Sequence, residues 1–273
     1  MESNSPERLE TMVAAAVASH IFMHPEIDAM LQIEETIFPI DLRQEYWSSI
    51  ERKFMEITGN LLPIPLRNMV FGFLKPLHET YDLWKKDHYL NKKIKQNVYK
   101  SCISWEIDSA TINRRKTAAK LIRNRRVDVR TRFIMACTYY QEDDIVDLWR
   151  QIRGKTRRAI TRRGSNDSVR FWVKLLKKKA THTWREEVEN HYRVTNSKPY
   201  DSPLILNCFF RYLNQGKQLQ MLIKQFATQR LHLEDFLLCM NHMDDYQRAN
   251  VRGRIPVFFF ELLADPGIMR DEA

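Results

Sequence analysis

The chain has 273 residues, of which 44% are hydrophobic, and its formal net charge at pH 7 is +10. This composition supports a folded core and excludes an intrinsically disordered chain. There are only seven glycines, and no two of them lie closer than ten residues, which excludes a GxGxxG loop, a GxSxG elbow and a complete Walker A loop.

The N-terminal hundred residues carry several helix signals. Pro6 follows a capping serine, and apolar residues recur after it at the 3.6-residue period of a helix. Asp41 is expected to cap a second helix that ends before Gly59. The pattern of residues 67–105 is again helical, and we expect Pro76 to kink or break that helix.

The rest of the chain shows the same period in shorter segments. Ser109 is expected to cap a helix that continues through Ile122. Further helices are predicted over residues 129–140, 144–152, 169–178, 204–213, 219–226, 231–240 and 255–263. No alternating apolar and polar run lies beside an Asn-Gly or Asp-Gly turn, so we expect no β-hairpin. These patterns predict an all-α fold built of packed helix pairs.

Two segments open in a similar way, with TRFIMAC at residues 131–137 and SPLILNC at residues 202–208. Their cysteines are 71 residues apart, close to two units of 35.5, and Cys102 and Cys239 extend the series at intervals of 35 and 31. A unit of this length is typical of helix pairs that stack in an array. An irregular helical domain is the alternative, because apolar core packing produces the same residues.

The two openings resemble the ankyrin repeat, whose first helix begins T-P-L-H-x-A. The matching positions are Thr131, Phe133 and Ala136 in one segment and Ser202, Pro203 and Leu204 in the other. Tyr140 stands in place of the turn glycine, and the glycine-containing hairpin between repeats is missing. The resemblance covers two units, under a quarter of the chain, and implies a partly solenoid-like, ankyrin-like repeat array. We expect an N-terminal helical segment at residues 1–106 and the array at residues 107–273, with a single domain as the alternative.

Basic residues are concentrated in the middle of the chain. Residues 113–185 contain 22 Lys or Arg and 6 Asp or Glu, whereas the remaining 200 residues carry a net charge of −6. We call the candidate binding residues of this region the basic strip: Arg114, Arg115, Lys116, Arg125, Arg126, Lys155, Arg157, Arg158, Arg162, Arg163, Lys177, Lys178 and Lys179. Such a charge attracts acidic protein surfaces and polyanions.

The predicted function is a non-catalytic protein-interaction module of helical repeats that binds an acidic protein partner. The alternative is a nucleic-acid-associated protein that contacts the phosphate backbone through the strip. Aromatic residues suited to single strands are few, with Phe171, Trp172 and Trp184 as local candidates, and Trp172 is expected to pack in the core. A solvated face neutralised by the acids of residues 142–147 is a third interpretation of the strip.

Candidate catalytic and metal-binding patterns are incomplete. His20 and His24 are spaced i, i+4 but lack the glutamate of a zincin motif, and Cys239 with His242 forms a lone CxxH. The Gly154-Lys155-Thr156 sequence ends like a phosphate loop, but Trp149 stands where the partner glycine is needed. Glu187 and His191 could pair along a helix without being marked as an acid–base couple. The acids of residues 142–147 are expected to cap a helix through Asp143 or Asp144. We therefore expect neither an enzyme nor a metal or other cofactor.

The expected compartment is the cytoplasm or the nucleus. The four cysteines each lie in an apolar stretch, as free buried thiols do, and no CxxC pair exists. The apolar run of residues 13–23 follows glutamates rather than a basic region, so it does not resemble a signal peptide. No stretch approaches 18 consecutive apolar residues, and no membrane association is expected.

Overall fold

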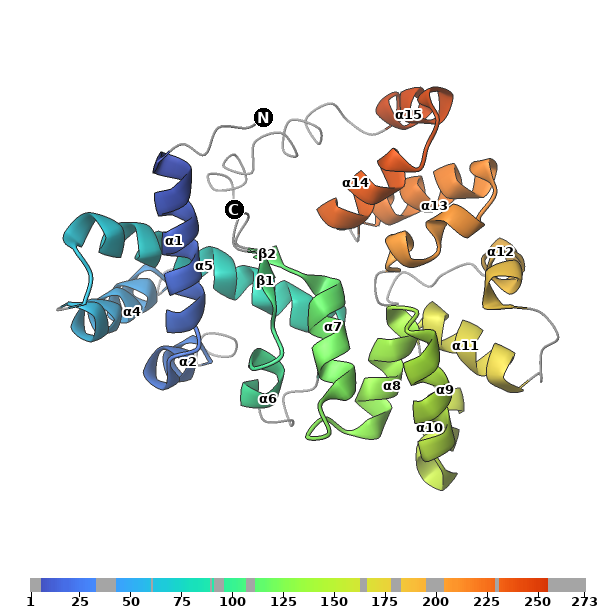
Figure 1. Cartoon of the computed structure of the whole chain (residues 1–273), viewed down its shortest axis with the longest axis horizontal. Helices are drawn as coiled ribbons and strands as arrows, with labels where there is room; N and C mark the ends of the chain where they lie inside the picture. The colour runs from blue at the N-terminus through green and yellow to red at the C-terminus, as the bar shows by residue number, and fades with distance from the viewer. Residues whose placement is uncertain are drawn as a thin grey trace. The chain divides into compact units, whose positions relative to one another are not determined.

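The computed structural model describes residues 6–32, 43–59, 61–88, 90, 96–106, 111–162, 166–177, 183–194, 204–228 and 231–254. The chain forms two compact units, Met1–Val127 and Asp128–Ala273. The described residues form fourteen α-helices, two 3₁₀ helices and one two-stranded sheet (Figure 1). This predominance of helix confirms the prediction of an all-α fold.

The first unit is built around one long helix. Its helices are α1 (Pro6–Ile21), α2 (Pro25–Leu31), α4 (Arg43–Thr58), α5 (Ile64–Asp87), α6 (Gln96–Lys100) and α7 (Arg114–Arg123). Helix α5 packs against α1 and α4, and α2 contacts α4. Their facing sides bury Ala14, Ala18, Ile50, Phe54, Val70, Leu74 and Trp84. The apolar periods of the sequence therefore correspond to the core of this unit.

A short β-hairpin in the first unit contradicts the expectation that hairpins are absent. Strands β1 (Trp105–Glu106) and β2 (Thr111–Ile112) pair antiparallel, with Trp105 opposite Ile112, and β2 contacts α5. Each strand has only two residues, too few to show an alternating pattern, and tertiary contact stabilises the pair. The domain boundary was expected after residue 106, a position that lies between the two strands of this hairpin. Along the chain, the first compact unit ends at Val127 and the second begins at Asp128.

Prolines lie inside and at the start of helices of the first unit. Helix α5 continues through Pro76, which excludes a break, one of the two outcomes expected there. The helical pattern expected as far as residue 105 is wrong at its end, because α5 ends at Asp87 and Trp105 lies in a strand. Pro25 begins α2 at a position where a helix tolerates proline. Asn113 caps α7 by accepting a hydrogen bond from the amide three residues later. The expected caps Asp41 and Ser109 lie outside the described residues, but Asn113 rather than Ser109 is the N-cap of α7, so the predicted cap of that helix is wrong.

The second unit consists of short helices. They are α8 (Val129–Thr138), α9 (Glu142–Gln151), α10 (Gly154–Arg162), α11 (Asp167–Lys177), α12 (Trp184–Val194), η2 (Leu206–Cys208), η3 (Phe210–Tyr212), α13 (Gln215–Ala227), α14 (Leu233–Asn241) and α15 (Asp245–Arg252). Helix α11 contacts α8, α10 and α12, while η2 contacts α14 and α13 contacts α15. The buried side chains include Phe133, Ala136, Leu148, Phe209 and Trp172, which lies in the core as expected.

Several helices of this unit differ from the sequence-based expectation. Residues 204–213, predicted as one helix, form the two short 3₁₀ helices η2 and η3. Helices α10, α12 and α15 were not among the predicted helical ranges, because their sequences are more polar on average than those of the other helices of this unit. A capping box between Asp244 and Gln247 begins α15. The helix expected over residues 255–263 lies outside the described part of the chain.

The turn between α8 and α9 contains a strained residue. Tyr140 has a φ of 54°, in the left-handed region that favours glycine. Its amide donates to the carbonyl of Cys137 (3.3 Å), and the amide of Gln141 donates to the carbonyl of Ala136 (3.0 Å). These two bonds form a Schellman motif. A tyrosine thus occupies a left-handed position at which glycine is the favoured residue.

The four cysteines are free. Cys102 lies in the turn after α6, Cys137 in α8, Cys208 in η2 and Cys239 in α14. Cys208 is partly exposed, and the other three are buried. Burial raises the pKa of the Cys137 and Cys239 thiols, which keeps them protonated and unreactive.

Candidate functional site

Helix α7 separates a buried apolar face from an exposed basic one. Thr117, Ala118, Leu121 and Ile122 are buried, Arg114 and Ala119 are half-buried, and the remaining positions are exposed. We define the α7 basic face as the exposed cations of this helix and of the turn that follows it: Arg115, Lys116, Lys120, Arg123, Arg125 and Arg126. Lys120 and Arg123 were not among the strip residues predicted from the sequence.

The ionic partners of α7 distinguish one arginine from the rest. Arg114 donates to the carboxylate of Asp87 at 2.9 Å, and both side chains are only 12% exposed. None of the six residues of the α7 basic face forms an ion pair with an acid in the described part of the chain. Arg114 therefore anchors α7 to the end of α5, whereas the α7 basic face is exposed and has no ion pair with a described acid.

The second unit holds the other predicted strip residues. Lys155, Arg158 and Lys177 are exposed. Arg157 is instead held by α9: its guanidinium lies 4.1 Å from the centre of the Trp149 ring and donates to the Trp149 carbonyl at 3.2 Å. The cation–π contact and the hydrogen bond fasten α10 to α9.

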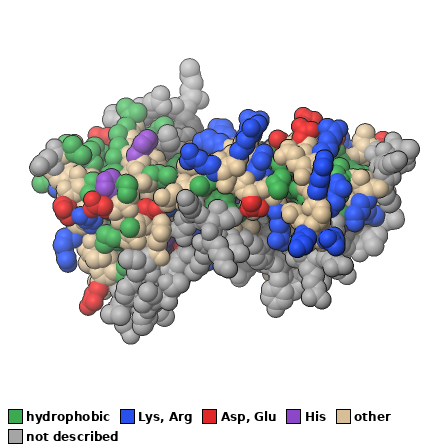
Figure 2. Space-filling view, turned by 90° about the horizontal axis from the view of Figure 1, so that it is seen from below, with side chains coloured by type: hydrophobic (Ala, Val, Ile, Leu, Met, Phe, Trp, Pro, Cys, Tyr) green, Lys and Arg blue, Asp and Glu red, His purple; other side chains and the backbone are tan. Residues whose placement is uncertain are grey.

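Four predicted strip residues lie wholly or partly outside the described residues. The side chain of Arg162 and the whole of Arg163, Lys178 and Lys179 lie outside the described residues. Exposed Lys and Arg side chains are nevertheless abundant on the face shown in Figure 2, with few acidic side chains among them. Five of the thirteen predicted residues belong to the first unit and eight to the second.

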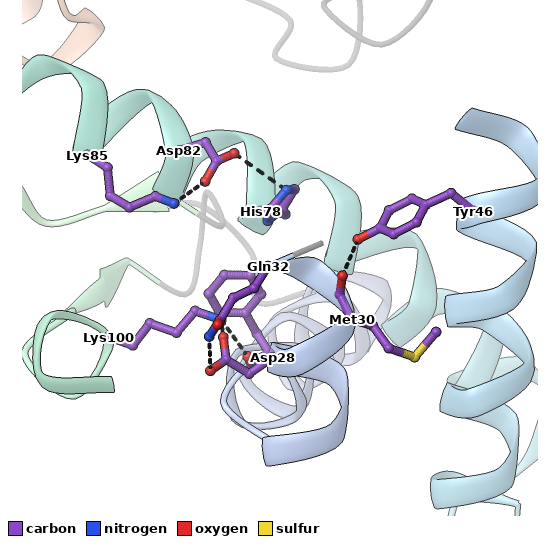
Figure 3. Close-up of polar contacts among 9 residues, drawn as sticks. Asp28, Met30, Gln32, Tyr46, His78, Asp82, Lys85 and Lys100 are labelled. Carbon is purple, nitrogen blue, oxygen red and sulfur yellow. Dashed lines mark hydrogen bonds and ion pairs between the residues drawn. The ribbon is translucent and has the colours of Figure 1, made fainter. Parts of the chain in front are cut away.

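A buried polar network occupies the first unit (Figure 3). Lys100, at the end of α6, forms an ion pair with Asp28 of α2, and their side chains are 4% and 11% exposed. The Lys100 ammonium also donates to the Phe22 carbonyl (3.3 Å) and lies 3.9 Å from the centre of the Phe22 ring. Gln32 donates to the second oxygen of Asp28 at 2.9 Å.

The Asp28–Lys100 pair lies in a groove to which helix α5 contributes further charged side chains. Asp82 lies 2.7 Å from the Lys85 ammonium and 3.5 Å from the His78 ring nitrogen. The groove is lined by Asp28, Leu31, Gln32, His78, Tyr81, Lys85 and Lys100. The groove lining therefore includes the Asp28 carboxylate and the ammonium groups of Lys85 and Lys100.

The Lys100 amine is buried, as the amine of a reactive lysine often is, but it is held by several partners. Burial lowers the pKa of Lys100, although the Asp28 carboxylate opposes this effect. A lysine with a lowered pKa is a better nucleophile. The ammonium, however, is engaged by a carboxylate, a carbonyl and an aromatic ring, so the network fastens α6 to α2 rather than presenting a nucleophile. Asp28 and Lys100 are 72 residues apart, and no sequence signal joins them.

An aromatic cluster fills the second unit around Tyr140. Its ring centre lies between 5.1 and 6.0 Å from those of Phe171, Trp172, Trp184 and Phe209. Burial raises the pKa of the Tyr140 hydroxyl, which lies 2.9 Å from the Tyr192 hydroxyl. The hydroxyls therefore stay protonated, and the cluster has a structural role.

The acidic residues of α9 have structural partners. Glu142 accepts a hydrogen bond from the Trp184 indole nitrogen at 2.8 Å, and Asp147 pairs with Arg150 at 3.1 Å. Gln141, rather than Asp143 or Asp144, occupies the N-cap of α9, so the predicted cap is wrong. The acids lie instead in the first turn, where they interact favourably with the helix dipole.

Glu187 and His191 line a shallow groove between α11 and α12, together with Phe171, Lys174 and Leu175. Burial lowers the pKa of His191 to about 4, and the charges of Lys174 and Arg170 act in the same direction. A neutral imidazole at pH 7 fits a half-buried side chain that packs against the Phe171 and Tyr192 rings.

In the described part of the chain, no three His, Cys, Asp or Glu side chains are placed to hold a metal ion. None of the helices described is both long and apolar enough to span a membrane. No protein-family model, curated protein or solved structure matches this chain. The α7 basic face is the strongest candidate for a functional surface.

Proposed function

We propose that this chain is a non-catalytic interaction module that binds an acidic protein partner through the α7 basic face. The observation that carries the proposal is the contrast within α7, where Arg114 is neutralised by Asp87 and the six outward cations have no ion pair with a described acid. A group of uncompensated cations attracts acidic surfaces and accelerates association with them.

The local structure supports a binding role because it holds the cations on a rigid element. The inner side of α7 is buried, Asn113 caps its first turn, and Arg114 anchors it to α5. A surface that is already ordered loses less conformational entropy when a partner binds than a flexible tail does.

The second unit fits the same role. We propose that its helix pairs form an ankyrin-like array, since stacked pairs of this kind present extended binding surfaces. The left-handed conformation of Tyr140 between α8 and α9 supports this view.

Duplex nucleic acid is the second candidate partner of the same face. Six exposed Lys and Arg side chains suit the phosphate backbone, and such binding weakens steeply with salt. The outward side of α7 presents, besides these cations, only Ala119. Because this side lacks the amide and aromatic groups that read bases, a duplex would be bound through its phosphate backbone alone, without sequence specificity.

The test compares two triple variants that remove the same charge. One variant carries Lys116→Gln, Lys120→Gln and Arg123→Gln on α7. The matched control carries Arg153→Gln, Lys155→Gln and Lys177→Gln, which are exposed residues of the second unit. Binding of fluorescent poly-L-glutamate and of a 20-base-pair duplex is measured by anisotropy at about 50 mM salt.

We expect wild type and control to bind poly-L-glutamate alike, and the α7 variant to bind it at least about fivefold more weakly. An equal loss of affinity in both variants would show that only the net charge matters, and would reject the α7 basic face as the binding site. Failure of the wild type to bind either probe would reject the proposal. Tighter α7-dependent binding of the duplex would select the nucleic-acid alternative.

A further inference from the structure

Three cations of the α7 basic face form a row with defined spacing. Lys116, Lys120 and Arg123 are related as i, i+4 and i+7, and all three are exposed. With a rise of 1.5 Å per residue, successive members lie about 6 and 4.5 Å apart along the helix axis. The row is therefore about 10 Å long, comparable to two turns of another helix.

The residue at the centre of the exposed side of α7 has a small side chain. Ala119 is four residues from both Arg115 and Arg123, so it lies between them on the helix surface, and it is half-buried. A methyl group flanked by long cationic side chains leaves room for the backbone of a partner to approach, while the ammonium and guanidinium groups reach past it on both sides.

The positive charge of the α7 basic face is concentrated toward the C-terminal end of the helix. Arg123, Arg125 and Arg126 gather at the C-terminal end of α7. Acidic residues are most favourable in the first turn of a helix, where the helix dipole is positive. A partner helix that runs antiparallel to α7 would place its acidic first turn beside these three arginines.

We infer that the occupant of the α7 basic face is an acidic α-helix of a partner protein, antiparallel to α7, with carboxylates at i, i+3 and i+7. This inference rests on the proposed function and adds the shape of the partner to its charge. In the antiparallel direction, the i, i+3, i+7 spacing reproduces the 4.5 and 6 Å steps of the row, so each carboxylate faces one cation. Three exposed ion pairs, each contributing roughly a factor of two, amount to about an eightfold gain in affinity.

The experiment uses two fluorescent peptides of identical composition on an Ala and Gln background. The stripe peptide repeats Glu at i, i+3 and i+7, and the scatter peptide distributes the same glutamates around the helix. Circular dichroism confirms equal helicity of the peptides and intact folding of each protein variant. Full-length wild type, the α7 variant and the second-unit control are titrated at about 50 mM salt.

We expect wild type and control to bind the stripe peptide about five- to tenfold more tightly than the scatter peptide, and the α7 variant to lose this preference. Equal, α7-dependent binding of both peptides would overturn the helical partner and leave the proposed function standing. If neither peptide nor poly-L-glutamate binds, both conclusions fail. If a 20-base-pair duplex competes the stripe peptide off α7 at a lower charge concentration than poly-L-glutamate, the helical protein partner is also overturned.

Discussion

The hydroxyl oxygens of Tyr140 and Tyr192 lie 2.9 Å apart inside the second unit. Tyr140 reaches this position from a left-handed turn, with a φ of 54°, that an L-residue adopts at a cost of about 1–2 kcal/mol. The hydrogen bond and the surrounding aromatic rings hold it there. A residue chosen for the turn alone would be glycine, so the packing of the side chain decides this position.

Replacement of Tyr140 by glycine tests this balance. The Tyr140→Gly variant relieves the backbone strain but removes a buried aromatic side chain, which costs about 3–5 kcal/mol. We expect a net loss of about 1–4 kcal/mol in the free energy of unfolding, measured by urea denaturation. Tyr140→Phe is the control, because it keeps the ring and should cost only about 1 kcal/mol. A glycine variant as stable as wild type would contradict the importance of the cluster.

The ion pair between Asp28 and Lys100 predicts strong energetic coupling. We expect Asp28→Ala to lower the free energy of unfolding by about 3 kcal/mol, because it leaves the buried ammonium without its carboxylate. Lys100→Met should be destabilising for the converse reason. The double variant Asp28→Ala with Lys100→Met should lose clearly less than the two single losses combined. Additive losses in urea denaturation would show that the two residues act independently.

His88 predicts a dependence of stability on pH. Burial lowers its pKa to about 3, with the Arg114 charge as a second cause, whereas an unfolded histidine titrates near about 6.5. Between these values the unfolded state binds a proton that the folded state does not, so stability is lost as the pH falls. From pH 7.5 to 5.5 the free energy of unfolding should fall by about 1.4 kcal/mol through His88 alone.

His88→Gln provides the comparison for this pH effect. The variant should show a drop between pH 7.5 and 5.5 that is smaller by about 1.4 kcal/mol, whatever its stability at pH 7.5. His191, whose pKa is lowered to about 4, contributes in the same direction in both proteins. Identical pH slopes for variant and wild type would mean that His88 titrates normally in the folded state.

Arg157 predicts a local effect on α10. Its contact with Trp149 fastens a short helix that buries few apolar side chains, so Arg157→Gln should destabilise α10 by about 1 kcal/mol. Amide hydrogen exchange should become about fivefold faster in α10 and stay unchanged in α8 and α11. Lys155→Gln, an exposed change in the same helix, is the control and should leave exchange in α10 unchanged.

Sequence periodicity located the helices that bury one apolar side. Helices α1, α4, α8, α9, α11, α13 and α14 lie where the 3.6-residue pattern predicted them, within a few residues at their ends. Helices α10, α12 and α15 also have an apolar and a polar side, but they were missed because their sequences are polar on average, and their contacts within the unit stabilise them. The β-hairpin was missed for another reason, because strands of two residues are too short to show an alternating pattern.

The sequence by itself determined the helical class, the excess of basic residues between positions 113 and 185, and the free state of the cysteines, because these follow from composition and local pattern. Only the tertiary structure decided which basic residues are available to a partner. Arg114 is neutralised by a residue 27 positions away and Arg157 stacks on a tryptophan, while Lys116 and Lys120 remain exposed. Pairing and burial depend on contacts between segments distant in the chain, which composition and spacing do not encode.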